Sequence, residues 1–228
     1  NKYKTSEYKK FILYDPKQRE IFKLPYFPDR IVHHAILNVL ENIFIKTFTV
    51  NTYNCIKGRG IHKAFYKLKN NLKDVENTKY CLKIDIKKFY PSINNEILKQ
   101  LLRKKFKDQK LLNLLDEIIS STTGVPIGNY CSQFFANFYL SYFDHWIKEE
   151  LKVKYYFRYC DDMILFSNNK EDLHIILNKI KLYLETNLKL ELKSNYQIFP
   201  VNKRGIDFIG YKFYHTYIKL RPSIKKRF

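Results

Sequence analysis

The feature that most constrains the fold is a pair of strand-like runs that lie only three residues apart. Residues 155–159 and 163–167 are rich in aromatic and branched apolar side chains, and Cys160, Asp161 and Asp162 lie between them. So short a connection predicts a tight antiparallel hairpin, with two adjacent carboxylates at its tip. A third run, residues 80–86, alternates apolar and polar side chains and carries Asp85 near its end. We therefore expect a sheet that presents carboxylates at one end.

The remaining apolar spacing completes a plan for this sheet. It predicts strands at 188–192 and 206–213, extended segments with a turn over residues 1–28, and helices over about 29–48, 61–72, 94–106, 110–120, 132–149 and 171–187. Asp29 and Ser132 are the expected N-caps of two of these helices. From residue 80 onward, apart from inserted helices, the order is β-α-β-β-α-β, which is the split-βαβ plan. In that plan the first strand neighbours the hairpin, so Asp85 is expected to converge with Asp161 and Asp162.

The charge of the chain indicates a polyanionic partner. Its 228 residues include 42 Lys and Arg against 22 Asp and Glu, a net charge of +20 at pH 7. A compact protein with this surplus repels itself unless a polyanion neutralises it, so nucleic acid is the expected partner. An acidic membrane surface is disfavoured, because the sequence has no bilayer-length apolar stretch and no lipidation motif. Four widely spaced cysteines and the lack of a signal segment favour a reducing, cytoplasmic location.

Three converging carboxylates require an explanation, because like charges that lie close together are costly. Two magnesium ions about 4 Å apart would supply one, since they neutralise the carboxylates, activate an attacking 3′-oxygen and hold a leaving phosphate. The alternative is that Asp161 and Asp162 form an ordinary turn and that Asp85 is a helix-entry residue. The carboxylates alone leave both interpretations open.

Five motifs in the same order resemble those of reverse transcriptases. They are the Tyr-x-Asp-Asp-like run 157–166, the first catalytic motif 85–93, the nucleotide-binding loop 124–133, the fingers motif 29–32 of bacterial, group II intron-like enzymes, and the primer grip 208–211. The resemblance implies an α+β right-hand polymerase fold, in which the palm is a split-βαβ antiparallel sheet with helices on one face. It implies fingers at 1–79 and 94–123, a palm at 80–93 and 124–222, and the start of a missing thumb at 223–228.

The resemblance also implies the role of each site residue. Asp85, Asp161 and Asp162 are the implied catalytic residues and, with Ile86, the metal ligands for two Mg²⁺ ions, for which Mn²⁺ could substitute. The implied nucleotide-binding residues are Lys17, Arg19, Phe89, Tyr90, Ile127, Gly128 and Lys193. Those implied to bind the RNA template and the DNA or RNA primer are Arg30, Arg59, Ser132, Gln133 and Gly210.

Several of these residues have simpler interpretations. Tyr90 is expected to exclude the 2′-hydroxyl of a ribonucleotide, although it could be a core tyrosine, and Phe89 fits the core better. Arg19 and Lys17 could be solvated surface residues, and the residues around Lys193 match the family poorly. Gly128 is expected where a loop turning under a base leaves no room for a Cβ.

The nucleotide-binding loop indicates a subtype. Most reverse transcriptases have Gln where this chain has Ile127 and Pro where it has Gln133, and the pattern found here resembles the enzymes of diversity-generating retroelements. That resemblance implies a bacterial or phage system with error-prone copying at adenines, dNTP substrates and a small basic accessory protein. The alternatives are a defence-type enzyme (abortive-infection or retron-like), a catalytically inactive nucleic-acid-binding relative, and a metal-dependent nuclease.

Overall fold

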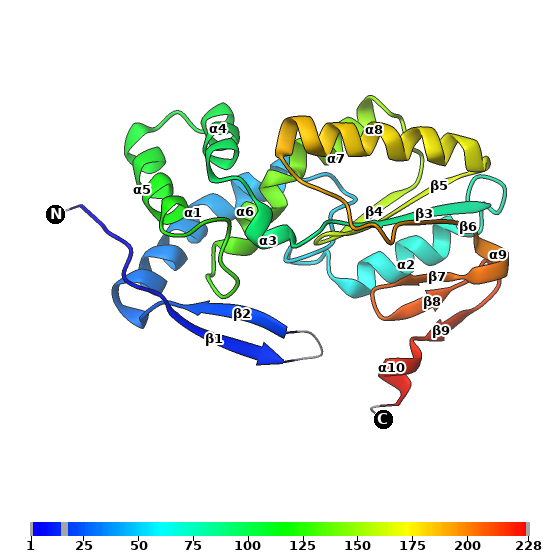
Figure 1. The fold of residues 1–228 in the computed structure, drawn as a ribbon, viewed down its shortest axis with the longest axis horizontal. Helices are drawn as coiled ribbons and strands as arrows, with labels where there is room; N and C mark the ends of the chain where they lie inside the picture. The colour runs from blue at the N-terminus through cyan, green and yellow to red at the C-terminus, as the bar shows by residue number, and fades with distance from the viewer. Residues whose placement is uncertain (1, 15–17, 227–228) are drawn as a thin grey trace. The chain divides into compact units, whose positions relative to one another are not determined.

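A computed structural model describes residues 2–14 and 18–226, which cluster into two compact units (Figure 1). Unit 1 comprises Asn1–Thr47, Lys88–Leu140 and Leu188–Leu190, and unit 2 comprises Phe48–Lys87, Ser141–Asn187 and Glu191–Phe228. These units divide the chain differently from the ranges implied for fingers and palm, because residues 48–79 cluster in unit 2 and residues 124–140 cluster in unit 1. The domain ranges therefore stay predictions.

Unit 1 consists of a β-hairpin and helices. The strands are β1 (Lys9–Tyr14) and β2 (Gln18–Lys23), and the helical elements are η1 (Tyr26–Arg30), α1 (Ile31–Thr47), α3 (Phe89–Ser92), α4 (Asn95–Lys105), α5 (Gln109–Ser120) and α6 (Ser132–Tyr139). The expected extended segments at the start of the chain are the antiparallel β1–β2 pair, with Phe11 opposite Ile21. The expected turn at residues 15–17 lies outside the described residues.

Aromatic packing forms the core of unit 1. The Phe44 ring on α1 is fully buried, and its centroid lies 5.3 Å from that of Phe138 and 5.7 Å from that of Phe106. Side-chain caps set the starts of two helices, since Asn94 Oδ1 accepts from Ile97 N at 3.1 Å and Asp108 Oδ1 accepts from Leu111 N at 2.9 Å. Such caps satisfy backbone donors that the first turn of a helix leaves unpaired.

Unit 2 is built on a four-stranded antiparallel sheet. Its strands β3 (Tyr80–Asp85), β4 (Tyr156–Tyr159), β5 (Asp162–Ser167) and β6 (Gln197–Pro200) follow the order β4-β5-β3-β6. This is the split-βαβ order, so that prediction is confirmed, including the pairing of the first strand with the hairpin. The fourth strand was wrongly expected at 188–192. Of those residues, Leu192 forms an isolated bridge to Ile86, and the Glu191 carbonyl accepts from Lys87 N–H at 2.9 Å.

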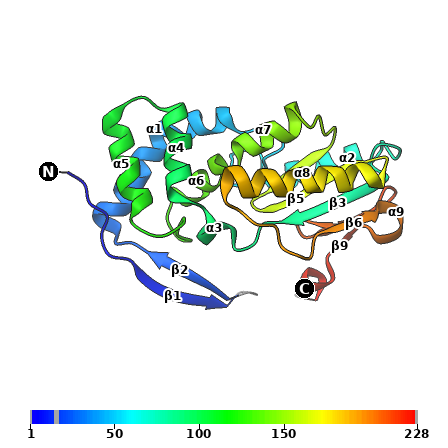
Figure 2. The same cartoon turned by 45° about the horizontal axis from the view of Figure 1, so that its top comes forward.

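The two faces of the sheet are covered differently. Figures 1 and 2 show α8 (Lys170–Leu188) lying along one face, where α7 (Ser141–Glu149) also packs. The opposite face carries α2 (Ile61–Asn71) and a second sheet of β7 (Ile206–Phe208), β8 (Tyr211–Phe213) and β9 (Ile218–Leu220). Helices are thus not confined to one face. The short helices α9 (Val201–Arg204) and α10 (Pro222–Lys225) complete the unit.

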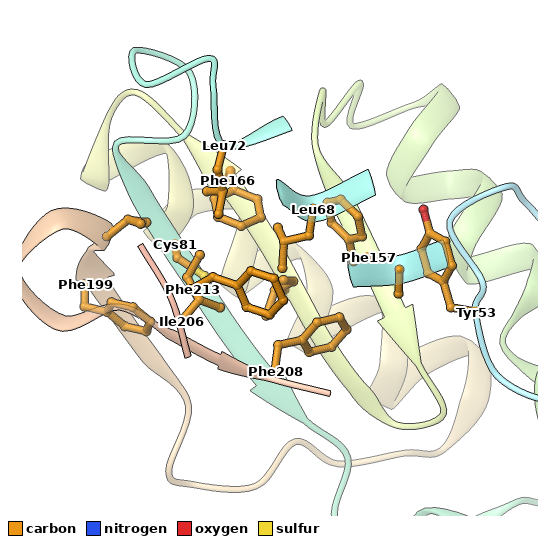
Figure 3. Packing of buried hydrophobic residues seen from close by; sticks show 13 residues of the cluster. Tyr53, Leu68, Leu72, Cys81, Phe157, Phe166, Phe199, Ile206, Phe208 and Phe213 are labelled. Carbon is orange, nitrogen blue, oxygen red and sulfur yellow. The ribbon is translucent and has the colours of Figure 1, made fainter. Parts of the chain in front are cut away.

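A buried cluster joins the sheet to these elements. Figure 3 shows Leu68 of α2, Leu72 directly after that helix, and Phe208 and Phe213 of the second sheet among Cys81, Phe157 and Phe166 of the first. Cys81, Lys83 and Asp85 share this face of β3, since successive side chains alternate. Apolar packing therefore fills the face near Cys81, and polar side chains remain near Asp85.

Three local expectations were wrong. The helix expected over 132–149 is two helices, α6 and α7, separated at Leu140. The aromatic spacing continues across that break, so periodicity alone cannot reveal it. The strand expected over 206–213 is the β7–β8 hairpin, which turns at Ile209 and Gly210, both with positive φ. Asp29 does not cap α1, because its Oδ1 accepts hydrogen bonds from Tyr3 and Ser6.

Candidate functional site

Strand register brings two of the predicted acidic residues together in unit 2. In the β3–β5 pair, Asp85 lies directly opposite Asp162, and directly opposed residues have Cα atoms about 4.5–5.5 Å apart. Asp161 is the second residue of the two-residue turn between β4 and β5, and Asp162 is the first residue of β5. The carboxylates therefore lie at one end of the sheet, because the tight hairpin fixes where β5 begins.

Two lysines pair with these carboxylates. Lys193 Nζ lies 2.6 Å from Asp85 Oδ2, and its backbone N–H donates to the Asp85 carbonyl at 2.8 Å. Lys83 Nζ lies 3.4 Å from Asp162 Oδ2 and also donates to the carbonyl oxygen of Asp207 on β7. Asp85 and Asp162 thus each have one ammonium neighbour from the same unit.

The site remains short of positive charge and of hydrogen-bond donors. Burial, and to a lesser extent the negative charge of Asp85, raise the pKa of Asp161 to about 6. Burial likewise raises the pKa of Asp162 to about 6, although Lys83 opposes that shift. Asp85 Oδ1 and Asp162 Oδ1 are buried and accept no hydrogen bond from the described residues. Carboxylate oxygens in this state suit a hard cation such as Mg²⁺.

The arrangement does not itself enclose a metal. Within residues 2–14 and 18–226, no three His, Cys, Asp or Glu side chains gather closely enough to hold an ion. Ile86, the other implied ligand, has a fully buried side chain and follows Asp85 directly. The chemistry of the oxygen donors fits a divalent cation, and the ligand set stays a prediction.

Sequence reasoning missed a buried ion pair beside the hairpin. Arg158 of β4 and Asp144 of α7 both have side chains with 0% exposure, and Arg158 Nη2 lies 2.6 Å from Asp144 Oδ2. In the sequence, Arg158 lies within the Tyr-x-Asp-Asp-like run 157–166 and Asp144 within the helix expected over 132–149, and neither residue was assigned a role. A charged residue at an inward position of each element was the signal that could have paired them.

In unit 1, backbone contacts position the predicted nucleotide-binding loop. Val125 N–H donates to the Tyr90 carbonyl at 2.9 Å, and Phe22 N–H on β2 donates to the Ile127 carbonyl at 2.8 Å. These bonds bring Tyr90, Ile127 and Gly128 into the same unit as the β1–β2 hairpin. Arg19 is exposed on β2, and Lys17 lies outside the described residues.

Two glycines of this loop lie where a side chain would not fit. A Cβ on Gly128, which has φ +123°, would lie 2.3 Å from the Phe22 carbonyl oxygen. On Gly124, with φ +70°, it would lie 2.5 Å from the Pro91 carbonyl oxygen. The sequence predicts that Gly128 lacks a Cβ because the loop turns under a nucleotide base. In the structure, the backbone that leaves no room for a Cβ is that of Phe22 on β2.

The other predicted residues lie in varied surroundings. Phe89 is buried with its ring against Tyr90, which agrees with a core role. The N-cap of α6 is Cys131, so Ser132 is the first residue of the helix and not its cap. The Ser132 Oγ instead donates to the Pro126 carbonyl. Arg59 Nη1 donates to the Thr49 carbonyl at 3.1 Å. Arg30 and Gln133 are exposed, and Gly210 lies in the β7–β8 turn with φ +90°.

Comparison with known proteins identifies the class. Residues 15–213 match the family described as "Reverse transcriptase (RNA-dependent DNA polymerase)". The chain therefore belongs to the reverse transcriptase family, whose members are RNA-directed DNA polymerases. This confirms the predicted enzyme class and, with the structural comparison below, the predicted fold class.

Several curated proteins are similar to this chain. Protein YkfC of Escherichia coli K12 is 23% identical over 83% of this chain and 61% of its own length. The group II intron-encoded protein LtrA of Lactococcus lactis is 21% identical over 90% of this chain and 46% of its own. The retron Ec73 reverse transcriptase of Escherichia coli is 30% identical over 83% of this chain and 64% of its own. The chain thus spans about half to two thirds of these relatives.

A solved structure shares the fold. Candida tropicalis telomerase truncated from its C-terminal domain aligns with a TM-score of 0.69 at 14% identity, over 94% of this chain and 55% of that one.

In the described part of the chain, every helix is too short or too polar to cross a lipid bilayer.

Proposed function

We propose that this chain is the polymerase domain of a reverse transcriptase that copies an RNA template into cDNA by two-metal-ion nucleotidyl transfer. The supporting observation is the pairing of Asp85 with Asp162 at the end of the sheet, where one oxygen of each carboxylate is buried and accepts no hydrogen bond from the described residues. Asp85, Asp161 and Asp162, with Ile86, would hold two Mg²⁺ ions. When bound, these supply the charge that activates a 3′-oxygen and stabilises the leaving pyrophosphate.

The remaining residues take roles in binding. Lys193, hydrogen-bonded to Asp85, is proposed to give a proton to pyrophosphate. Tyr90 is proposed to exclude ribonucleotides, and Arg19 and Lys17 to bind the triphosphate. The basic surface is proposed to hold the RNA template and its DNA or RNA primer. We propose that unit 1 provides most of the fingers and unit 2 most of the palm, in a protein of the bacterial or phage-infected cytoplasm.

Primer extension on an RNA template tests the assignment. With Mg²⁺ present, Asp161→Asn should abolish dNTP incorporation while RNA affinity changes less than about threefold, because phosphate contacts dominate affinity. Asp172→Asn makes the same chemical change at an exposed position of α8 and should incorporate like the parent. Near-parental incorporation by Asp161→Asn would exclude the two-metal assignment.

For the biological setting we propose a diversity-generating retroelement, supported by Ile127 and Gln133 in the nucleotide-binding loop. A small basic accessory protein would then be a partner. A retron-like or other defence role is the second candidate, favoured by the 30% identity to the retron Ec73 enzyme. Sequencing the cDNA made from one RNA separates them, because errors concentrated opposite adenine are expected only in the first setting.

A further inference from the structure

The largest fully buried side chain of the described residues belongs to Arg158, and it is charged. Its Nε donates to Asp144 Oδ1 at 2.8 Å, and its Nη2 donates to Asp144 Oδ2 at 2.6 Å. Asp144 also accepts from Tyr156 Oη at 2.7 Å and from Thr52 Oγ1 at 3.0 Å. Both carboxylate oxygens are therefore satisfied, as a buried charge requires.

The third guanidinium nitrogen of Arg158 donates a hydrogen bond to a residue outside the Arg158–Asp144 ion pair. Arg158 Nη1 donates to the carbonyl oxygen of Cys160 at 3.1 Å. Cys160 opens the turn that carries Asp161, and its φ of +56° is a left-handed conformation that a residue with a Cβ rarely adopts. A specific contact is needed to hold such a residue in place, and Arg158 supplies one.

The backbone of Arg158 is itself fixed. Its N–H donates to the Asn51 carbonyl at 2.9 Å, and its carbonyl accepts from Tyr53 N–H at 3.0 Å. Asn54 Nδ2 adds a contact to Cys160 Sγ. The segment 51–54 therefore covers the outer edge of β4 up to the turn, so the guanidinium and the turn share one rigid support.

Stability does not account for this pair. Replacing a buried ion pair with apolar residues of similar volume is often neutral or stabilising. An apolar side chain cannot, however, donate to the Cys160 carbonyl. From this we infer that Arg158, oriented by Asp144, is a positioning residue that fixes the Cys160–Asp161 turn and thereby the Asp161 carboxylate beside Asp85.

This inference rests on the proposed function, and it makes a specific prediction about metal affinity. Residues that orient metal ligands typically alter metal affinity or activity by about 10- to 100-fold when mutated. A lysine at position 158 keeps the charge but lacks the planar fork that reaches Asp144 and the Cys160 carbonyl together. Arg158→Lys should therefore weaken Mn²⁺ binding, measured by electron paramagnetic resonance, about tenfold or more. It should lower kcat for dNTP incorporation similarly, with KM for dNTP within about threefold of the parent value.

A matched control separates positioning from general disturbance of the core. Tyr156→Phe removes one hydrogen bond to Asp144 and leaves the contact between Arg158 and the Cys160 carbonyl. It should keep Mn²⁺ affinity and kcat within about threefold of the parent, although it loses roughly 1 kcal/mol of stability. If Arg158→Lys does not fold, the double variant Asp144→Leu/Arg158→Met replaces it, because this variant removes both buried charges together. We expect the double variant to fold and to lose Mn²⁺ affinity to the same extent.

The outcomes distinguish the two proposals. A parent protein that binds Mn²⁺ but incorporates no dNTP would contradict the proposed function, while the Mn²⁺ measurement would still test Arg158. A folded Arg158→Lys or double variant with parental Mn²⁺ affinity would overturn the positioning role. The same conclusion would follow if Tyr156→Phe weakened Mn²⁺ binding as much as Arg158→Lys.

Discussion

Unit 1 and unit 2 hold their predicted functional residues by different kinds of contact. In unit 2 the acidic residues lie among side-chain ion pairs, with Lys193 at Asp85, Lys83 at Asp162 and the buried Arg158–Asp144 pair behind the turn. In unit 1 the predicted nucleotide-binding loop is positioned by backbone hydrogen bonds to Tyr90 and Phe22, and two of its glycines lie close to neighbouring backbone. Unit 2 should therefore be sensitive to loss of charge, and unit 1 to addition of a Cβ.

The largest expected effect is the loss of a buried charge in unit 2. Asp144→Ala leaves Arg158 buried and unpaired, which should lower the free energy of unfolding by about 3–5 kcal/mol. The control in unit 1 is Asp116→Ala, which removes an ion pair that solvent reaches, to Arg103, and should cost at most about 1 kcal/mol. Urea denaturation measures both. Equal losses would contradict the difference that we draw between the units.

The next effect should fall on unit 1. Gly128→Ala places a Cβ against the Phe22 carbonyl at a positive φ, and we expect a loss of roughly 1–3 kcal/mol with a raised KM for dNTP. Gly60→Ala is the control, since a Cβ there meets no atom within 4 Å and φ is −80°. Steady-state kinetics and urea denaturation of the two variants test this. A Gly128→Ala protein with parental KM would show that the loop tolerates displacement.

A smaller effect concerns the unfavourable charge at the unit 2 site. The pKa of Asp161 is about 6 in the folded protein and about 3.9 in an unfolded chain. The folded state thus binds more protons between these values, and Asp161 makes the protein less stable as pH rises from about 4 to 6. In EDTA at pH 7, Asp161→Asn should therefore be more stable than the parent by an amount of the order of 1 kcal/mol.

The pH dependence of that gain supplies its control. Urea denaturation of both proteins should show the difference at pH 7 and its loss below about pH 4, where Asp161 is protonated in both states. A difference that does not change with pH would assign the effect to packing. An Asp161→Asn variant less stable than the parent at pH 7 would contradict the burial argument.

The smallest effect should come from Ile127. Isoleucine has no donor or acceptor, so Ile127→Gln could restore a polar contact to the nucleotide worth about 0.5–1.5 kcal/mol, or roughly 2- to 13-fold in discrimination. We expect misincorporation to fall more opposite template adenine than opposite the other bases. Sequencing cDNA from both proteins on one RNA measures this. An unchanged error spectrum would indicate that Ile127 only packs beneath the loop.

The same difference between the units explains what the sequence could predict. The convergence of Asp85 and Asp162 was predictable because the split-βαβ order places the first strand beside the hairpin. The two-residue alternation and the three-residue gap then place the acidic residues at the ends of these strands. The contact between Gly128 and Phe22 joins segments more than a hundred residues apart, and no local pattern encodes it. The break at Leu140 was missed because apolar spacing continues through it, and the fourth strand was misplaced because the short β6 lacks a clear alternation.

The position of β3 within the sheet has a consequence for biosynthesis. β3 occupies residues 80–85, yet its two neighbours, β5 and β6, begin at residues 162 and 197. At about 5–20 residues per second, a ribosome needs several seconds to add the first of these partners. During that interval a strand rich in apolar residues has both edges unpaired, which is the condition under which nascent chains aggregate or recruit chaperones. Expression yield should therefore depend on translation speed between codons 86 and 162.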